Sequence, residues 1–382
     1  MTGVEDWDLV VVGAGPAGAT TALSALRADP GLKVLLLDRE SFPRDKSCGD
    51  GIAPHAVDVL GALGAADVVE GWTPLQRLEL SRGRRRVSGR MARPVWVIPR
   101  ETFDARLVDH AVAAGATLRR HRVRDLRRDG DAPVLDDALR ARIVVGADGA
   151  HSVVRSWLGA DPGRRALAIR GYTATPPALR HRQVIRFGER RQPSYAWSFD
   201  RGDGWANVGY GELVGDGEPP TRQLLLDQLD ELLPGTVATG TQWRGHHLPL
   251  SGLRWGADQP DGAVLLVGDA AGLVNPMTGE GIYYAVATGS LAGRAAARAL
   301  ADGSPTSAAA LHRRWVRRLL GRHLQHTWAA ARLSRSPAVV GAGISAATRH
   351  RRVFDDLVEL GLGDGRITPR LAAGLAAALV QD

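Results

Sequence analysis

Two short apolar runs near the start of the chain flank a glycine-rich turn. Residues 8–12 and 33–37 are rich in valine and leucine, and the turn at 13–18 reads GAGPAG. The stretch 19–28 that follows the turn has the composition of a helix. We therefore expect a strand, a helix and a second, parallel strand within about 30 residues, the unit from which parallel α/β sheets are built.

The glycine spacing in this turn matches the dinucleotide-binding fingerprint. In that fingerprint Gly13 permits the tight turn, Gly15 lets the backbone approach a pyrophosphate, and Gly18 allows close packing of the helix. The N-terminus of the helix adds the positive end of a dipole. Asp38 follows the second run, about twenty residues after the turn, where an acid accepts hydrogen bonds from a ribose. The unit therefore predicts a bound dinucleotide.

Two further glycine clusters extend this pattern. Residues 146–155 read GADGAHSVVR and follow a strand-like run, while residues 268–272 read GDAAG and lead into NPMTGEG at 275–281, where a helix opens. With the three clusters in this order, the chain resembles the FAD-dependent oxidoreductases of the aromatic hydroxylase superfamily. The resemblance implies that the dinucleotide is FAD.

The same resemblance implies roles for particular residues. Asp269 would hold the ribityl chain of the flavin, and the helix start at Gly279 and Gly281 would face the pyrimidine end of the ring, where unpaired amides stabilise negative charge. Arg100 matches the arginine that this superfamily places near FAD. The residues expected to bind FAD are Gly13, Gly15, Pro16, Ala17, Gly18, Asp38, Arg39, Arg44, Cys48, Gly49, Arg100, Asp148, Gly268, Asp269, Gly279, Gly281 and Ile282.

Two shorter segments carry a narrower resemblance. Residues 43–51, PRDKSCGDG, look like the cysteine loop that lies over the flavin in the geranylgeranyl reductase family. Tyr195 and Trp197 stand in YAWSF, which is similar to the Y-x-W-x-F-P motif on the sheet that floors that family's substrate cavity; here Asp200 replaces the proline. The expected catalytic residues are Cys48, Tyr195 and Trp197, with Cys48 either a weak proton donor or a packing residue against the ring.

The narrower resemblance implies an enzyme that reduces carbon–carbon double bonds of an isoprenoid or other apolar polyene by hydride transfer from FADH2. The substrate would be an apolar small molecule, an isoprenoid diphosphate or a lipid, and the reductant either NAD(P)H or an electron-donor protein. The alternative is a monooxygenase that hydroxylates or epoxidises an aromatic or polyketide substrate through a flavin hydroperoxide. A non-catalytic flavin-binding partner protein is a third interpretation.

The distribution of strand-like and helix-like segments predicts an α/β fold. It comprises a Rossmann-type FAD-binding domain, an inserted mixed β-sheet substrate domain and a helical C-terminal region. The expected boundaries are 1–75 with 95–165 and 255–300 for the FAD-binding domain, 76–94 and 166–254 for the substrate-binding domain, and 301–382 for the helical region.

The charge and composition of the chain limit the classes of partner that it is expected to bind. Lysine and arginine total 49 against 41 acidic residues, a net charge of +8. Such an excess of arginine suits anionic partners, and it also arises from a GC-rich genome. Residues 311–333 mix arginine with leucine and tryptophan, which fits either a docked helix with a solvated basic face or a helix resting on an anionic membrane. We expect no nucleic acid, because no recognition module accompanies the charge.

The remaining sequence features argue against a disulfide-linked, secreted, membrane-spanning or metal-binding protein. One cysteine leaves no internal disulfide, and the sequence shows neither a secretory signal nor 18 consecutive apolar residues. We therefore expect a cytoplasmic protein, with a peripheral position at the inner membrane face left open. His246 and His247 lack neighbours at ligand spacing, so no metal is expected. Residues 339–346, VVGAGISA, imitate a second fingerprint but fit a pair of helix-packing glycines.

Overall fold

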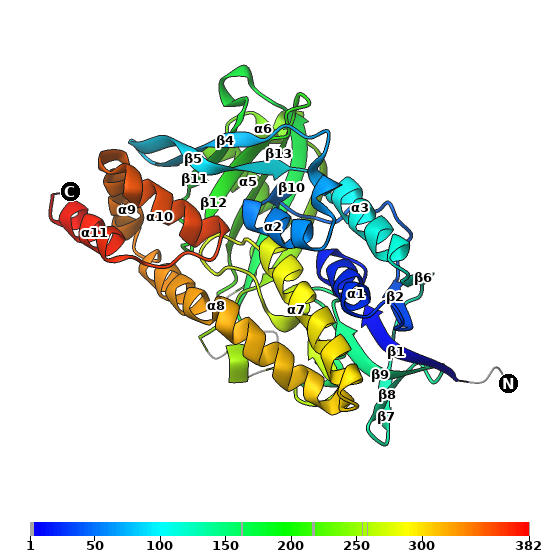
Figure 1. Ribbon diagram of the computed structural model, residues 1–382. Helices are drawn as coiled ribbons and strands as arrows, with labels where there is room; N and C mark the ends of the chain where they lie inside the picture. The colour runs from blue at the N-terminus through cyan, green and yellow to red at the C-terminus, as the bar shows by residue number, and fades with distance from the viewer. Residues whose placement is uncertain (1–3, 162, 216–217, 254, 258, 382) are drawn as a thin grey trace.

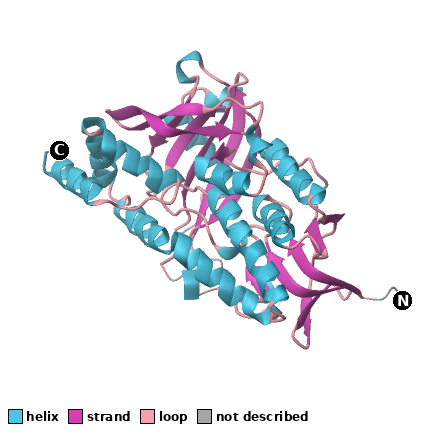
Figure 2. Ribbon diagram, viewed as in Figure 1, coloured by secondary structure: helices cyan, strands magenta, loops and turns pink. Residues whose placement is uncertain are grey.

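The structure is a computed structural model that describes residues 4–161, 163–215, 218–253, 255–257 and 259–381. Its strands gather in two regions separated by helices (Figure 2). The N-terminus lies beside the first sheet, and the C-terminal helices lie beside the second (Figure 1). The two sheets and the helices between them position the candidate site.

The first sheet has seven strands within the described residues, in the order β6-β2-β1-β9-β8-β7 with β15 beside β9. Pairings among β1, β2, β6, β9 and β15 are parallel, whereas β7 and β8 extend the sheet in antiparallel fashion. This arrangement confirms the expected Rossmann-type sheet. The bounds are β1 Glu5–Val12, β2 Val34–Asp38, β6 Thr117–Arg120, β7 Leu126–Asp129, β8 Ala132–Leu135, β9 Leu139–Gly146 and β15 Val264–Leu266.

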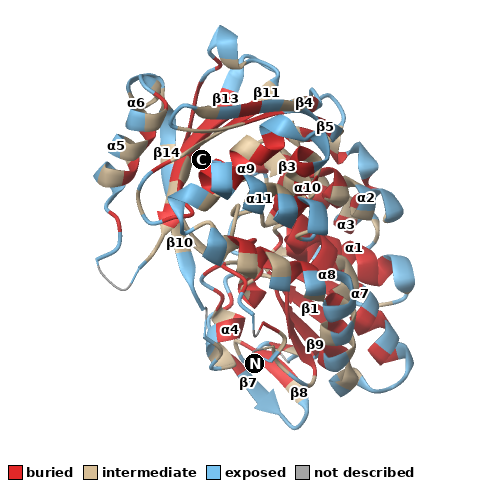
Figure 3. Ribbon diagram, turned by 90° about the vertical axis from the view of Figure 1, so that its left-hand side faces the viewer, coloured by how far each residue is buried: buried red, intermediate tan, exposed pale blue. Residues whose placement is uncertain are grey.

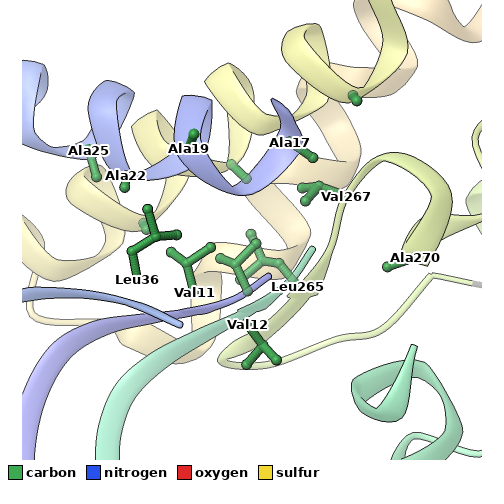
Figure 4. Close-up of a cluster of buried hydrophobic side chains, with 14 of the residues drawn as sticks. Val11, Val12, Ala17, Ala19, Ala22, Ala25, Leu36, Leu265, Val267 and Ala270 are labelled. Carbon is green, nitrogen blue, oxygen red and sulfur yellow. The ribbon is translucent and has the colours of Figure 1, made fainter. Parts of the chain in front are cut away.

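Helices α1 (Pro16–Ala28) and α7 (Ile282–Ala301) cross this sheet side by side (Figure 1). A Cβ at Gly289 or Gly293 of α7 would lie 2.3 Å from a backbone oxygen of α1, so the two helices approach this closely only because both positions are glycine. Figure 4 shows the strand side chains Val11, Leu36 and Leu265 packing beneath α1. Helices α2 (Pro54–Ala62), α3 (Arg100–Ala113) and α4 (Val153–Trp157) complete this half of the molecule.

The second sheet has eight strands among the described residues, in the order β14-β10-β13-β12-β11-β4-β5-β3. Its pairings are antiparallel except for β11 with β4. Because side chains alternate along a strand, the two faces differ. Ala196 and Tyr210 pack under α5 (Arg222–Leu232), while Tyr195 and Trp197 point to the opposite face. The bounds are β3 Gly51–Ile52, β4 Leu75–Arg82, β5 Arg85–Val97, β10 Arg165–Ala174, β11 Arg182–Phe187, β12 Tyr195–Asp200, β13 Trp205–Leu213 and β14 Thr241–Pro249.

The segments of the second sheet do not coincide in full with the expected substrate domain. Strand β3 and the last residues of β5 were expected within the FAD-binding part, yet β3 pairs with β5 through Gly51 with Val97 and Ile52 with Trp96. The two-residue strand follows directly on the cysteine loop. The segment that carries the cysteine loop therefore runs from the first sheet into the second, and the division into domains remains a prediction.

Helices α9 and α10 of the C-terminal region lie against β5 of the second sheet, on the face that carries Tyr195 and Trp197, whereas α8 packs on α7 and β15. Helix α9 packs on β4, β5 and α11, with Gly341 and Gly343 in its buried interior, as the helix-packing interpretation predicts. The remaining bounds are α6 Thr236–Thr239, α8 Ala308–Leu333, α9 Pro337–Arg349, α10 Arg351–Leu362 and α11 Pro369–Gln381, with short 3-10 turns η1 Ala66–Val69, η2 Pro177–Leu179, η3 Trp255–Ala257, η4 Gly268–Ala271 and η5 Pro305–Ser307.

Candidate functional site

The turn between β1 and α1 forms one corner of the site. Gly13 has φ +100°, and a Cβ there would lie 2.4 Å from the carbonyl oxygen of Ala147. A Cβ on Gly18 would lie 1.8 Å from the carbonyl oxygen of Gly13. The backbone can therefore pack this closely only because neither position has a side chain. Pro16 is the first residue of α1, where its missing N–H costs nothing. The turn leaves the free amides of the helix start facing outward from Gly15.

Two arginines lie above Gly15. A Cβ on Gly15 would lie 3.5 Å from Nη2 of Arg44 and 3.8 Å from Nη2 of Arg100. Arg100 is buried and donates from Nε and Nη2 to the carboxylate of Asp104 at 2.6 and 2.8 Å, and Nη1 of Arg44 lies 3.1 Å from the same carboxylate. Asp104 pairs with both guanidiniums and so holds two cationic groups beside a helix N-terminus, an arrangement that suits a diphosphate.

The acid at the end of β2 is engaged with the turn. Oδ2 of Asp38 accepts a hydrogen bond from the amide of Ala14 at 2.9 Å, and Oδ1 accepts one from the amide of Glu40 at 3.0 Å. Nη2 of Arg44 lies 3.7 Å from Oδ2. Arg39, by contrast, has a side chain that is 67% exposed and pairs with Glu40, and it does not line the cavity described below.

Asp148 lies outside the cavity wall, and its carboxylate accepts hydrogen bonds from backbone amides. Its Oδ2 accepts from the amides of Val153 at 2.7 Å and Val154 at 3.4 Å, at the start of α4. Burial raises the pKa of Asp148, and these hydrogen bonds lower it. Its neighbours Ala147 and Gly149 line the cavity, but Asp148 does not. The structure thus gives Asp148 a supporting position beside the turn at Gly13.

The start of α7 forms the opposite side of the site. Gly279 has φ +71°, and a Cβ there would lie 3.4 Å from the hydroxyl of Tyr195, which donates to the carbonyl of Thr278. Gly281 and Ile282 line the cavity. Asp269 lines it too, with Oδ2 3.5 Å from Nζ of Lys46. Gly268 has φ +53° and packs against Ala17 and Ala285 instead.

A buried polar network that the sequence interpretation missed supports the cysteine loop. Nδ2 of Asn207 donates to the carbonyl of Cys48 and to Oδ2 of Asp50, both at 2.8 Å. Tyr172 donates to the same carboxylate at 2.6 Å, and Nε1 of Trp197 donates to Oδ1 of Asn207 at 2.8 Å. Burial raises the pKa of Asp50 to about 6 against these hydrogen bonds. The network joins the loop to the aromatic strand.

The strand pairing explains how the aromatics fit. Trp197 and Tyr195 on β12 face Gly209 and Gly211 on β13 in register. A Cβ on Gly209 would lie 2.2 Å from the Trp197 ring. Gly209 therefore leaves room for the Trp197 ring to lie on the sheet, whereas a Cβ on Gly211 would meet Ala168. Both glycines stand in the sequence as GYG at 209–211, on the strand that follows YAWSF.

Asp200, which stands where the family motif has proline, takes a structural position. It is buried, and its two carboxylate oxygens accept hydrogen bonds from the hydroxyl of Thr175 at 2.9 Å and the amide of His181 at 2.6 Å. Asp200 does not line the cavity. Asp200 therefore holds the segment between β10 and β11, which contains Thr175 and His181, in place beside the end of β12.

Cys48 and Glu280 line the cavity, and burial raises the pKa of both groups. Burial raises the pKa of the Cys48 thiol, so the thiol is neutral near pH 7. Loss of hydration raises the pKa of Glu280 to about 7, while amide donors at the start of α7 lower it. Oε1 of Glu280 accepts from the amide of Tyr283 at 2.8 Å. Sequence reasoning quoted Glu280 in its motif without assigning it a role.

One continuous cavity joins these parts. The empty space inside it, counted together with the open solvent at its mouth, is about 2570 Å³. It runs from Gly15 and Arg100, past Cys48 and the start of α7, over the aromatic strand. Beyond the aromatic strand, the cavity is lined by apolar side chains of the second sheet and the C-terminal helices, including Leu78, Leu80, Ile185, Phe187, Val340, Ile344, Leu357, Leu371 and Leu375.

Among the predicted site residues, the structure places Gly15, Pro16, Ala17, Cys48, Gly49, Arg100, Tyr195, Trp197, Asp269, Gly279, Gly281 and Ile282 on the wall of this cavity. Gly13, Gly18, Asp38, Arg44, Asp148 and Gly268 lie in the shell around it, and Arg39 faces solvent. The residues present fit FAD, because a glycine at the helix start and two guanidiniums form a cradle that a side chain at Gly15 would fill.

Comparison with known proteins agrees with this geometry. The family model of the FAD binding domain matches residues 6–181. The chain is 36% identical to menaquinone reductase of Mycolicibacterium smegmatis over 75% of each chain. It is 33% identical to digeranylgeranylglycerophospholipid reductase 1 of Methanopyrus kandleri over 81% of this chain and 86% of that one. The fold matches a geranylgeranyl bacteriochlorophyll reductase-like protein of Thermoplasma acidophilum with a TM-score of 0.79 at 19% identity, covering 99% and 97% of the two chains.

The FAD-binding fold and the relatives named as reductases define this protein as an FAD-dependent oxidoreductase. Within that class the chain belongs to the geranylgeranyl reductase family. The expectation formed from the cysteine loop and the aromatic strand is thus confirmed at the level of family.

Proposed function

We propose that this enzyme reduces a carbon–carbon double bond in the isoprenoid chain of a lipid. The observation that carries the proposal is the continuous cavity, which leads from the helix starts of α1 and α7 into an apolar chamber. Its length of apolar wall suits a polyene chain, because burying such a chain removes a large apolar surface from water. Two relatives are named for lipids that carry isoprenoid chains, menaquinone and digeranylgeranylglycerophospholipid.

We assign the binding of FAD to the residues around the two helix starts. Arg44 and Arg100 would hold the diphosphate above Gly15, and Asp38 with Arg39 would lie at the adenosine end. Asp269 would hold the ribityl chain, with Gly279, Gly281 and Ile282 at the flavin and Cys48 with Gly49 covering it. Gly13, Pro16, Ala17, Gly18, Asp148 and Gly268 would shape the backbone that these groups need. The bound cofactor, once reduced to FADH2, would supply the hydride, which carries both electrons of the reduction.

The chain itself contributes orientation, exclusion of water and a proton. Trp197, locked by its hydrogen bond to Asn207, forms the floor on which the alkene would lie. Addition of a hydride to one alkene carbon requires a proton at the other. The neutral thiol of Cys48 and the carboxyl of Glu280, with a pKa of about 7, are donors that line the same cavity. The donor is reprotonated from solvent after each turnover.

The test uses the FAD-loaded enzyme, reduced without oxygen and then mixed with menaquinone or a geranylgeranyl phospholipid. We expect substrate-dependent return of the oxidised flavin absorbance and a product heavier by two hydrogens. Cys48→Ala should slow this step roughly 10²-fold or more while FAD stays bound, and Cys48→Ser should recover part of the rate. Ser47→Ala, which alters the adjacent side chain, serves as the control.

A product that carries an oxygen atom and forms only when oxygen is admitted would overturn the proposal, because that is the outcome for a monooxygenase. An unchanged rate in both Cys48→Ala and Glu280→Gln would overturn the assignment of the proton donor, since the donor would then lie elsewhere. We further propose that NAD(P)H or an electron-donor protein reduces the flavin and that the enzyme meets its lipid at a membrane surface. Reduction of the bound flavin by NADPH alone distinguishes the two reductants.

A further inference from the structure

Helix α8 carries an uncompensated row of arginines. Its 26 residues include six arginines, at 313, 314, 317, 318, 322 and 332, and no acidic residue. Arg313 pairs with Asp261, whereas Arg314, Arg318, Arg322 and Arg332 are exposed. Arg314, Arg318 and Arg322 recur every four residues, which places them on one face of α8 as a stripe, and Arg332 lies ten residues farther along the helix.

The opposite face of α8 holds the helix on the protein. His312, Val316, Leu320 and Leu324 are buried there. The arginine stripe is therefore not needed to dock the helix. It remains at the surface, where like charges without compensating acids on the same helix repel one another and cost stability. A stripe of this kind calls for an anionic partner.

Apolar side chains border the stripe. Leu319 is 40% exposed and Leu333 is 50% exposed, and Trp315 is half-buried beside them. Arginine on the polar side with leucine and tryptophan at its edge is the pattern of helices that lie in the interface of a bilayer. The same apolar border is a liability in a face that meets only water or nucleic acid.

The helix that carries the stripe ends on the wall of the substrate cavity. Leu333, the last residue of α8, lines the cavity and is 50% exposed. Ser334 and Val339, in and after the turn between α8 and α9, line it as well. A lipid chain entering at this point would pass along the row of apolar residues described above toward Trp197.

Helix α11 adds a second apolar surface on the same side of the molecule, which faces the viewer in Figure 3. Leu379 is 45% exposed and Val380 is 88% exposed. The other exposed residues of its outer face are largely alanines, at 372, 373, 376 and 377. Within the described residues, no helix is long and apolar enough to span a bilayer. Contact with lipid at this face would therefore be peripheral.

We propose that the outward face of α8, from Arg314 to Leu333, docks on an anionic membrane surface and opens the cavity toward the bilayer. Each arginine near an anionic leaflet contributes about 1 kcal/mol of attraction, so four of them bind without any insertion of a spanning helix. The inference rests on the proposed function for the identity of the lipid substrate, but the docking itself does not depend on turnover.

The test measures sedimentation of the FAD-loaded protein with vesicles of phosphatidylcholine mixed with phosphatidylglycerol. We expect binding that falls with added salt and is absent with phosphatidylcholine alone. Reversing two charges in Arg318→Glu with Arg322→Glu should weaken binding roughly a hundredfold or more. The matched control, Arg122→Glu with Arg124→Glu, makes the same change of charge at exposed positions beside β6 and should retain binding.

Turnover of detergent-dispersed lipid separates the two proposals. The α8 variant should keep the wild-type rate with substrate in detergent and lose it with substrate in anionic vesicles. Equal loss of vesicle binding in the control variant, or no binding of the wild-type protein to anionic vesicles, overturns the docking surface while leaving the proposed reduction intact. Preference for RNA over vesicles would also overturn it.

Discussion

Replacing Gly209 by alanine should displace Trp197 from the cavity floor. The added Cβ would lie 2.2 Å from the Trp197 ring and 2.3 Å from the carbonyl oxygen of Ile169, so either the ring or the backbone must shift. Overpacking of this kind costs about 1–3 kcal/mol. If the ring moves, Nε1 also leaves Asn207, and an unsatisfied buried amide costs about 1–3 kcal/mol more.

The expected loss in free energy of unfolding is therefore roughly 2–5 kcal/mol, after about 0.4–1 kcal/mol is returned because alanine restricts the unfolded chain. Urea unfolding of the FAD-loaded protein, followed by tryptophan fluorescence, measures it. Gly211→Ala is a matched control two residues along the same strand, where the new Cβ would lie 3.2 Å from the Cβ of Ala168. We expect that variant to stay within about 1 kcal/mol of the wild type.

Alkene reduction should fall with stability in the Gly209 variant, because the network through Asn207 also holds the carbonyl of Cys48. If Gly209→Ala proves as stable as Gly211→Ala, then the glycine does not make the space for Trp197, and the argument that links β12 to β13 fails. A stable but inactive Gly209 variant would instead show that the ring matters for the substrate alone.

Three further outcomes can be measured. The pKa of Asp50 is raised from 3.8 to about 6 in the fold, so its stabilising effect is present in acid and is lost as pH rises; the wild type should lose about 2 kcal/mol relative to Asp50→Asn between pH 4 and 6 in urea titrations, and parallel curves would contradict this. Arg44→Gln should weaken FAD binding by roughly tenfold or more in fluorescence titrations, while Arg122→Gln should not. In Glu280→Gln, the fall in rate as pH rises through about 7 should disappear, and a retained fall would assign it to another group.

Local sequence predicted the FAD-binding half of the molecule well. The strand, glycine turn and helix at residues 8–28 are contiguous in the chain, and each glycine role follows from backbone geometry that the neighbouring residues decide. The structure has β1, α1 and β2 where the pattern indicated, and Arg44 and Arg100, from two other segments of the chain, lie beside Gly15. The cysteine loop and the aromatic strand were likewise visible as short motifs.

Contacts between distant segments could not be predicted in the same way. Asn207 meets Asp50 across 157 residues of chain, and Thr348 donates to the carbonyl of Arg86 across 262. Neither pair has a periodic signal, since a buried hydrogen bond between separate elements depends on how the two elements pack. For the same reason, the sequence pattern did not distinguish Asp148, which supports backbone, from Asp269, which lines the cavity.

The sequence by itself determined the cofactor class and the order of the elements, because glycine spacing and apolar periodicity act over a few residues. The tertiary structure decided what those elements enclose. The arginines of α8 could be counted in the sequence, yet only the fold shows that the helix that carries them ends at Leu333, on the wall of the cavity. The shape of that cavity depends on the pairing of two sheets with the C-terminal helices, and such long-range packing leaves no local pattern in the chain.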